Sequence, residues 1–414
     1  MKVFKFGGAS VRDSAAIRNV GSILRRYTGE KLVVVVSAMG KTTNALETIH
    51  DKRFKGEEYK SELDALIAYH RDICKEVVPG ECGVFDRVLD EFLQVLSESP
   101  DADYDMAYDS VVSFGELMST AIVTDYLNSQ GQRASMADAR EIVITGEQYR
   151  EGKVDWERTS SNAPQLIQLL ESAEILICQG FIGTTLSGHT VTLGREGSDF
   201  TAAILAYILN AESVTIWKDV PGMMNADPRR YPDAVLLEKI SYREAIELAY
   251  FGASVIHPKT VKPLQNKGIP LYVKSFIHPE EPGTVIQKDA AWDAVVPGFI
   301  FKDDQVLLSI TPRDFSFVVE ENLREIFEAL AESNVRINLM ENSALSFSIC
   351  VDKNERRISK LKELLNPHYE IRYNESVTLL TIRHGNEQTI KDLAKGREIL
   401  IEQLSRNTAR LVLR

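Results

Sequence analysis

The chain has 414 residues, which is enough for two or three domains. With 44% hydrophobic and 26% charged residues, its composition is typical of a soluble globular protein. A net charge of −12 argues against a broad nucleic-acid-binding surface. No apolar run approaches the roughly 20 residues of a membrane helix, and the first residues do not resemble a signal peptide. We therefore expect a cytoplasmic protein that binds neither nucleic acid nor membrane.

The four cysteines do not follow the spacing of a metal site. They are Cys74, Cys82, Cys178 and Cys350. Because none forms a CxxC pair and all stand in helical or strand-like contexts, the sequence predicts reduced, buried thiols. We expect no zinc site and no disulfide.

The first predicted element is a strand, residues 2–6, that runs into Gly7 and Gly8. Lys5 places an ammonium beside this glycine loop. Because glycine has no Cβ, the loop can approach a phosphate closely, and the helix expected at 14–26 points its positive end the same way. A terminal strand with a simple turn and a solvated lysine is the alternative.

A second strand-to-helix loop follows at residues 36–44 and ends like a P-loop, with Gly-Lys-Thr. The first glycine of a P-loop would fall on Val35, inside a strand, so this motif is excluded. The loop can instead present Ser37 and Thr43 to a small polar ligand. Helix capping is the alternative.

Glu116 lies within an apolar helix predicted over 104–127. A carboxylate there is costly unless it faces a site, where it could accept a substrate ammonium. The alternative for a single glutamate is a solvated helix face.

The polar loop 194–199 opens a helix expected at 200–209. Arg195 offers a planar fork suited to a carboxylate, and Ser198 offers an amide at the helix start. Asp199 can orient a lysine. Helix capping explains Ser198 or Asp199, but it does not call for Arg195 between two glycines.

Three further features stand near the end of this region. Lys218 and Asp219 follow the strand 214–217, so they should lie at the carboxyl edge of a sheet, where open sheets bind ligands. The segment 225–230 is either a turn with two guanidinium groups near a ligand or a surface turn. His257 has no second histidine nearby in sequence, so it indicates a structural residue and no metal.

Up to about residue 290, short β-rich runs alternate with helical patterns, which predicts an α/β sheet of mainly parallel strands. Near-continuous apolar runs mark the buried strands at 32–36, 175–178, 214–217 and 271–273. Helices are expected at 61–77, 85–96, 104–127, 200–209 and 242–251. Prolines and glycines place a domain boundary at 290–297.

Beyond this boundary a repeat with an offset of 73 residues appears. Residues 307–310 resemble 379–382, and 324–334 match 397–407. Each copy is expected to form strand, helix and strand. The first continues into a strand at 345–351, a helix at 355–365 and a strand at 369–373, which completes a βαββαβ unit. The second ends at Arg414 after three elements, and its sheet edge must be covered or paired.

Together and in this order, the loops resemble the aspartokinases of the amino-acid kinase superfamily. The motifs are KFGGAS, SAMGKTTN, SFGE, GREGSD, KDVPGMMNADPR and YFGASVIHP, followed by ACT-like repeats. The resemblance implies a three-layer αβα sandwich around a mainly parallel sheet, followed by α+β ACT-like modules. It implies a catalytic domain at 1–293, an ACT-like regulatory domain at 300–374 and a partial second module at 375–414.

The implied reaction is transfer of the ATP γ-phosphoryl group to the β-carboxylate of L-aspartate, with Mg2+ bridging the phosphates. The product is 4-phospho-L-aspartate, the first intermediate of aspartate-family amino-acid biosynthesis. Such transfer needs positioning and charge neutralisation more than covalent help.

The resemblance also assigns roles to single residues. Lys5 and Asp199 would be catalytic. The aspartate-binding residues would be Ser37, Thr43, Glu116, Arg195 and Ser198. The ATP-binding residues would be Lys5, Gly7, Gly8, Ser10, Lys218, Asp219, Met224, Arg229 and Lys259. No protein side chain is assigned to a metal.

Some positions depart from the family pattern. Ala9 stands where threonine is usual, which removes a hydroxyl from the substrate pocket, and Met224 replaces a tyrosine near the adenine. Ser254 replaces a usual lysine, so one phosphate contact is either lost or supplied by Lys259. The loop 312–322 lacks the glycine common in ACT effector loops. We therefore predict weak or no inhibition by the candidate effectors lysine and threonine, and a homodimer in which a partner chain or the first module completes the second.

Two other classes of function stay open. One is a sister kinase acting on glutamate, N-acetylglutamate, carbamate or UMP, and the other is a catalytically weak amino-acid sensor. Glu116 and Arg195 favour a free α-amino acid, because an acylated substrate has no ammonium. A nicotinamide dehydrogenase is disfavoured, since no GxGxxG follows a predicted strand.

Overall fold

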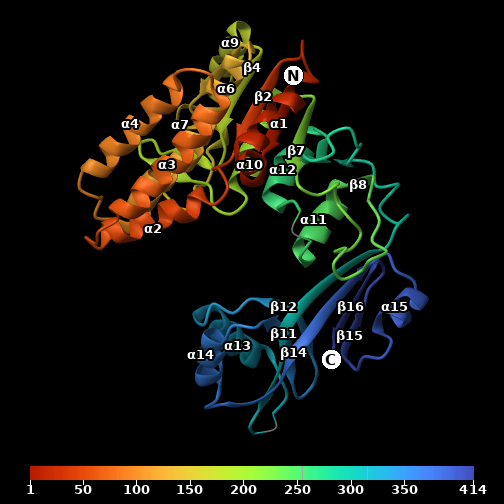
Figure 1. Cartoon of the computed structure of the whole chain (residues 1–414). Helices are drawn as coiled ribbons and strands as arrows, with labels where there is room; N and C mark the ends of the chain where they lie inside the picture. The colour runs from red at the N-terminus through yellow and green to blue at the C-terminus, as the bar shows by residue number, and fades with distance from the viewer. Residues whose placement is uncertain (254, 315) are drawn as a thin grey trace. The chain divides into compact units, whose positions relative to one another are not determined.

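The computed structural model describes residues 1–253, 255–314 and 316–414. The chain divides into two compact units (Figure 1). The first unit comprises residues 1–223, 236–246 and 254–290, and the second comprises residues 224–235, 247–253 and 291–414. In the described part of the chain, no helix is long and apolar enough to cross a membrane.

The first unit is built on an eight-stranded sheet with the order β3-β4-β2-β1-β7-β9-β10-β8. Its strands are β1 (Lys2–Phe6), β2 (Leu32–Val36), β3 (Ala134–Ala137), β4 (Ile175–Gln179), β7 (Ser213–Lys218), β8 (Lys239–Ser241), β9 (Leu271–Ser275) and β10 (Thr284–Gln287). Among the pairings of the described residues in this sheet, only that of β10 with β9 is antiparallel. The expected mainly parallel sheet is therefore confirmed.

Helices cover both faces of this sheet. They are α1 (Ser14–Arg25), α2 (Thr42–Phe54), α3 (Lys60–Val77), α4 (Gly83–Ser97), α5 (Tyr104–Val112), α6 (Phe114–Ser129), α7 (Ala139–Ile142), α8 (Trp156–Ser161), α9 (Ala163–Ser172), α10 (Gly197–Leu209), α11 (Tyr242–Phe251), which ends in the second unit, and α12 (Pro258–Lys267). Helix α10 packs on β1, β2 and β7, whereas α6 packs on β2, β3 and β4. All five residues of β2 are buried, as a strand between two helical layers requires.

The register of the parallel strands aligns their carboxyl ends. Phe6 of β1 pairs with Val36 of β2 and with Trp217 of β7, and Val36 pairs with Gln179 of β4. The loops after these four strands therefore emerge at one edge of the sheet. This edge carries the candidate site.

Two local predictions in the first unit are wrong. The helix expected over 104–127 is two helices, α5 and α6, that meet at Ser113. Cys74 on α3 and Cys82 at the start of α4 form a disulfide, although reduced thiols were expected. The short α3–α4 turn brings their Cα atoms to 6.5 Å, a proximity that spacing alone did not reveal. Cys178 and Cys350 are buried free thiols, as expected.

The second unit contains a six-stranded sheet, whose pairings within the described residues are antiparallel, in the order β12-β13-β11-β14-β16-β15. Its elements are β11 (Gly298–Pro312), α13 (Glu320–Glu332), β12 (Ile337–Asn342), β13 (Phe347–Asp352), α14 (Glu355–Leu365), β14 (Tyr369–Arg383), α15 (Glu387–Ala394), β15 (Ile399–Leu404) and β16 (Thr408–Leu413). The long strands β11 and β14 pair along most of their lengths. Apolar side chains of β11, β13 and β14 pack against those of α13 and α14 in one buried cluster.

The structure corrects the reading of the second repeat copy. Residues 397–407 match α13 in sequence but form the strand β15 and the turn to β16. Pairing of β15 with β16 overrides the helical pattern. The copy therefore has four elements from β14 onward, and the start of β11, residues 298–302, pairs with it as a further strand.

The exposed edge predicted for this copy is covered within the chain. Gln403 of β15 donates its side-chain amide to Met340 O of β12 at 2.6 Å, and Arg410 of β16 donates to Asn338 O. Leu339 and Ile401 belong to one buried cluster. The sheet therefore curves until its two outer strands approach each other.

Candidate active site

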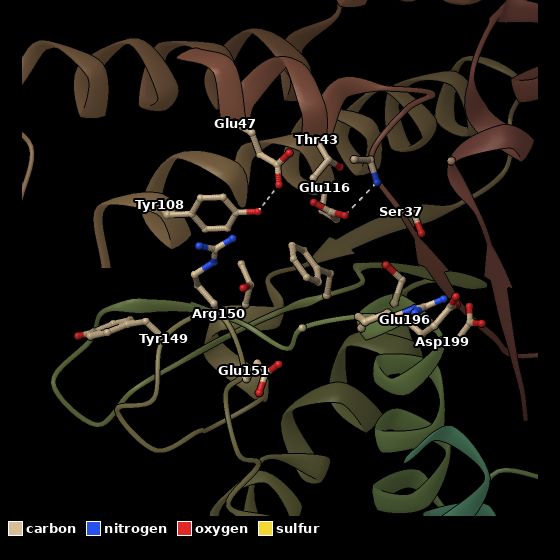
Figure 2. A pocket seen from close by; sticks show the side chains of 18 of the residues that line it. Ser37, Thr43, Glu47, Tyr108, Glu116, Tyr149, Arg150, Glu151, Glu196 and Asp199 are labelled. Atoms are coloured by element: carbon tan, nitrogen blue, oxygen red, sulfur yellow. Dashed lines mark hydrogen bonds between the residues drawn. The ribbon is translucent and has the colours of Figure 1, made fainter. Parts of the chain in front are cut away.

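The loops at the carboxyl edge of the first sheet surround a cavity of about 820 Å³ (Figure 2). Its wall comes from β1 and the loops after β1 and β2, from α2, α5 and α6, from residues 148–151, and from β6 (Thr190–Thr192) and the start of α10. Segments far apart in sequence thus face one space.

Lys5, Asp199 and Lys218 form a charged triad. Lys5 Nζ lies 2.6 Å from Asp199 Oδ1, and Lys218 Nζ lies 3.4 Å from Asp199 Oδ2. Burial alone would raise the pKa of the fully buried Asp199, but the two ammonium groups lower it below its usual value. Asp199 is therefore ionised and holds both lysines at the sheet edge.

A close backbone approach shapes the loop beside Lys5. Gly8 lies in a short 3-10 helix, η1 (Gly8–Val11), and its carbonyl accepts from Gly40 N at 3.0 Å. A Cβ on Gly8 would lie 2.7 Å from Ala38 O. The loops after β1 and β2 can therefore meet only if this residue is glycine.

Gly8→Ala is expected to separate these two loops, because a backbone carbonyl cannot move away as a flexible side chain can. Overpacking of this kind costs about 1–3 kcal/mol of unfolding free energy. Denaturant unfolding measures the loss. Gly83→Ala is the control, because open space surrounds that position at the start of α4. Equal midpoints for Gly8→Ala and the wild type would contradict the proposed fit.

Glu116 is buried at the start of α6, and only one of its two carboxyl oxygens has a hydrogen-bond partner among the described residues. Its Oε1 accepts from Ala38 N at 3.1 Å, whereas its buried Oε2 has no hydrogen-bond partner among the described residues. Burial raises the pKa of Glu116 to about 8, although the Ala38 amide and the Lys5 charge act in the opposite direction. A cation in the cavity would ionise this carboxyl and satisfy Oε2.

The other predicted aspartate-binding residues lie in the same wall. Arg195 is exposed, and its guanidinium has no hydrogen bond or ion pair to another described residue. Ser37 and Thr43 line the cavity from the loop after β2 and from α2, and Ser198 lines it from the first turn of α10. Among the described residues, the cavity wall thus contains both an unpaired guanidinium and an unsatisfied carboxyl oxygen.

Several predicted ATP-binding residues lie elsewhere. Ser10 is buried in η1 and is not part of the cavity wall. Asp219 is exposed directly after β7. Lys259 donates to Leu193 O at 3.0 Å and lines a second cavity. Gly7 lies beside the Lys5 ammonium.

Met224 and Arg229 belong to the second unit. There Arg229, with a side chain 88% exposed, pairs with Asp227 at 2.7 Å. Ser254 lies outside the described residues. The predicted contacts of Met224 and Arg229 with the nucleotide therefore stay a prediction.

Sequence reasoning missed the buried carboxylate of Asp109. It accepts from Arg150 N at 2.8 Å, from Thr192 N at 3.0 Å and from Thr192 Oγ1 at 2.7 Å. Asp109 thus ties α5 to the segment around Arg150 and to β6. A single aspartate in a helix carries no signal of this role. Arg150 itself has a left-handed φ of 63°, which this anchor helps to hold.

The outer wall of the cavity was also missed. Tyr108 donates its hydroxyl to Glu47 at 2.6 Å, and the Arg150 guanidinium lies 4.1 Å from the centre of the Tyr108 ring (Figure 2). Arg150 also pairs with Asp105 at 3.3 Å. Only Glu47 had a usable signal, because it follows Thr43 by one helical turn and so shares its face.

Comparison with known proteins identifies the family. The profile of the amino acid kinase family matches residues 1–275. Lysine-sensitive aspartokinase 3 of Escherichia coli (strain K12) is 31% identical over 362 residues, which are 84% of this chain and 78% of that protein. The chain belongs to the amino acid kinase family. Within the family it groups with the aspartokinases.

Other relatives are longer than this amino acid kinase. The chloroplastic bifunctional aspartokinase/homoserine dehydrogenase 1 of Arabidopsis thaliana is 30% identical over 382 residues, and the chain spans 42% of its length. Among solved structures, E. coli aspartokinase III with lysine and aspartate superposes with a TM-score of 0.85 at 27% identity, covering 100% of this chain and 95% of that one. The same enzyme with aspartate and ADP gives a TM-score of 0.79 at 27% identity, covering 100% and 96%. The expected fold, with an amino-acid kinase domain and ACT-like modules, is confirmed.

Proposed function

We propose that this chain transfers the γ-phosphoryl group of ATP to the β-carboxylate of L-aspartate, giving 4-phospho-L-aspartate, the first step of aspartate-family amino-acid biosynthesis. The observation that carries the proposal is the convergence of the Lys5–Asp199 ion pair with Glu116 and Arg195 around one cavity. The E. coli relative was solved with aspartate and ADP, which supports the same ligands here.

The proposed mechanism assigns opposite ends of aspartate to different groups. Arg195 binds the α-carboxylate through its planar fork. Glu116 accepts the ammonium with its free Oε2. The β-carboxylate then points toward Lys5, whose ammonium stabilises the negative charge that grows on the transferred phosphoryl group. Asp199 holds the Lys5 ammonium in position through their 2.6 Å contact.

The proposed nucleotide site begins at the same lysine. Glycine amides of residues 7 and 8 would face the phosphates, and Ser10, Lys218 and Asp219 are the other candidates of the first unit. The predicted contact from Lys259 is less favoured, because its ammonium donates to Leu193 O and lines the second cavity. Met224 and Arg229 are the candidates of the second. Among the described residues, no three His, Cys, Asp or Glu side chains cluster to hold a metal. We propose that Mg2+ enters on ATP, where it would neutralise phosphate charge.

Hydroxylamine trapping tests the reaction, because it converts an acyl phosphate into a stable hydroxamate. With ATP and Mg2+, we expect hydroxamate from L-aspartate and little from L-glutamate or N-acetyl-L-glutamate. N-acetyl-L-aspartate is the matched probe, because it keeps both carboxylates but has no ammonium for Glu116. Turnover of glutamate or N-acetylglutamate without turnover of aspartate would overturn the assignment in favour of a sister kinase. If none of these substrates is turned over, a catalytically weak amino-acid sensor is favoured.

The raised pKa of Glu116 predicts a pH dependence. Only the ionised carboxyl binds an ammonium well, so kcat/KM for aspartate should rise about ten-fold per pH unit from pH 6 and level off near pH 8. Initial rates at saturating ATP measure the profile. In Glu116→Gln the rise should disappear and the value at pH 8 should fall. A flat wild-type profile between pH 6 and 8 would contradict the role given to Glu116.

We further propose that residues 1–293 are catalytic and that 300–374 and 375–414 are regulatory modules of a homodimer. The E. coli relative was solved with lysine. In this chain the loop 312–322 contains no glycine, so we expect weak inhibition by lysine and threonine, with no sub-millimolar inhibition constant for either. Rates with each amino acid at 0.1–10 mM check this. A sub-millimolar constant would contradict the expected weak inhibition. A monomer in sedimentation at micromolar concentration would contradict the homodimer.

A further inference from the structure

A second cavity of about 390 Å³ lies within the first unit, away from the triad. It is lined by Trp156, Phe200, Tyr207, Lys259, Lys262, Pro263 and Asn266. Phe200 and Tyr207 are seven residues apart on α10, and the last four residues lie along one face of α12, which runs beside α10 (Figure 1). Its volume is in the range of small-molecule pockets, roughly 300–1,000 Å³.

Three aromatic rings form the apolar part of this cavity. The Trp156 ring lies 5.0 Å from that of Tyr207 and 6.2 Å from that of Phe200, both in edge-to-face arrangements. All three side chains remain partly exposed. Such edge-to-face packing can be extended by a further flat ring, since aromatic pairs prefer offset or edge contacts.

The polar part of the cavity is positive. None of its seven lining residues is acidic, and two are lysines. The Lys262 ammonium has no hydrogen bond or ion pair to another described residue. Within the described part of the chain, the one acceptor of the Lys259 ammonium is a neutral carbonyl, Leu193 O at 3.0 Å, and this ammonium lies 5.6 Å from the centre of the Phe200 ring. Three carboxylates outside the cavity wall act on Lys259 at longer range, but among the described residues none forms an ion pair with either lysine.

We propose that this cavity binds a small aromatic carboxylate, with its ring against Trp156 and Phe200 and its carboxylate between Lys259 and Lys262. A carboxylate between two ammonium groups forms charge-assisted hydrogen bonds, which are stronger than the bond from Lys259 to a neutral carbonyl. Binding would therefore draw Lys259 away from Leu193.

A consequence for catalysis follows, and it rests on the proposed function. Leu193 immediately precedes the loop 194–199, and Phe200 immediately follows Asp199. The contacts of Lys259 thus lie at both ends of the segment that carries Arg195 and Asp199. A ligand that moves Lys259 is expected to raise KM for aspartate more than it lowers kcat.

Calorimetric titration of the full chain with 2-naphthoate, without ATP or aspartate, tests the site independently of activity. We expect one site per chain, and binding about ten-fold weaker in Lys262→Met and in Trp156→Leu. 2-Naphthamide, which has the same ring without the charge, should bind at least about ten-fold more weakly. Lys75→Met removes an exposed lysine of α3 and should bind like the wild type.

Several outcomes would overturn the proposal. Undetectable binding at 1 mM, equal affinity for the acid and the amide, or full affinity in Lys262→Met would each exclude a carboxylate site. If naphthoate fails to bind and Trp156→Leu converts a dimer to a monomer in sedimentation, a second copy of the chain covers the cavity instead. If naphthoate binds as expected but no aspartyl hydroxamate forms, the site stands and the proposed function fails.

Discussion

Lys5→Met is expected to lower kcat by about 10²- to 10³-fold, the usual cost of losing one preorganised group that stabilises transition-state charge. Methionine keeps much of the side-chain volume but removes the ammonium that lies 2.6 Å from Asp199. KM for aspartate should change much less, because Glu116 and Arg195 remain. Steady-state rates of ADP release measure both constants.

Lys2→Met is the matched control for this change. Lys2 lies on the same strand, β1, but pairs with Glu30 at 2.6 Å and takes no part in the cavity wall. Its removal should leave kcat within about two-fold, since exposed ion pairs contribute little. A Lys5→Met enzyme with unchanged kcat would show that the measured activity belongs to another kinase or that Lys5 has no role in transfer.

Asp199→Asn should have the second large effect, on stability as well as on rate. It leaves the Lys5 and Lys218 ammonium groups without their shared counter-ion. Breaking a buried pair from one side typically costs about 3–5 kcal/mol of unfolding free energy. We also expect kcat to fall by about 10²-fold, because Lys5 is no longer aimed. Urea unfolding and ADP release measure the two effects.

The pH dependence separates this ion-pair contribution from simple packing. The folded-state pKa of Asp199 lies below its ordinary value, so the stability that the pair supplies is complete above about pH 4 and is lost as pH falls through the folded-state pKa. The wild type and Asp199→Asn should therefore converge in stability on acidification. Glu30→Gln, which breaks an exposed pair, should cost under about 1 kcal/mol. A stability difference for Asp199→Asn that does not shrink in acid would contradict the account.

The sheet of the first unit was predictable because its strands are buried on both faces. The apolar runs at 32–36 and 175–178 fall within β2 and β4, where every residue is buried and all except Gln179 are apolar. The second repeat copy was not predictable in this way. Residues 397–407 share the Arg-Glu-Ile start and the final asparagine of 324–334, most of which lies in α13, yet pairing with β16 makes 399–404 a strand. The sequence pattern alone predicts secondary structure where its hydrophobic pattern fits only one element. Elsewhere, pairing with distant strands decides the secondary structure.

The inner part of the candidate site was predictable because its loops place charged residues beside glycines. Lys5 beside two glycines and Arg195 within a glycine loop are costly unless a ligand uses them. The outer wall had no such signal. Asp109 and Arg150 are 41 positions apart, and their bond depends on how α5 meets the segment before α8. A left-handed φ at Arg150 is likewise invisible in the sequence.

The most direct test of the central claim is a phosphorus NMR spectrum of a reaction with ATP, Mg2+ and aspartate enriched with carbon-13 at its β-carboxyl group. The account predicts a new acyl-phosphate resonance coupled to the labelled carbon, present with the wild type and with Lys2→Met but absent with Lys5→Met. A phosphorus resonance without coupling to that carbon, or the same resonance at full rate in Lys5→Met, would contradict it.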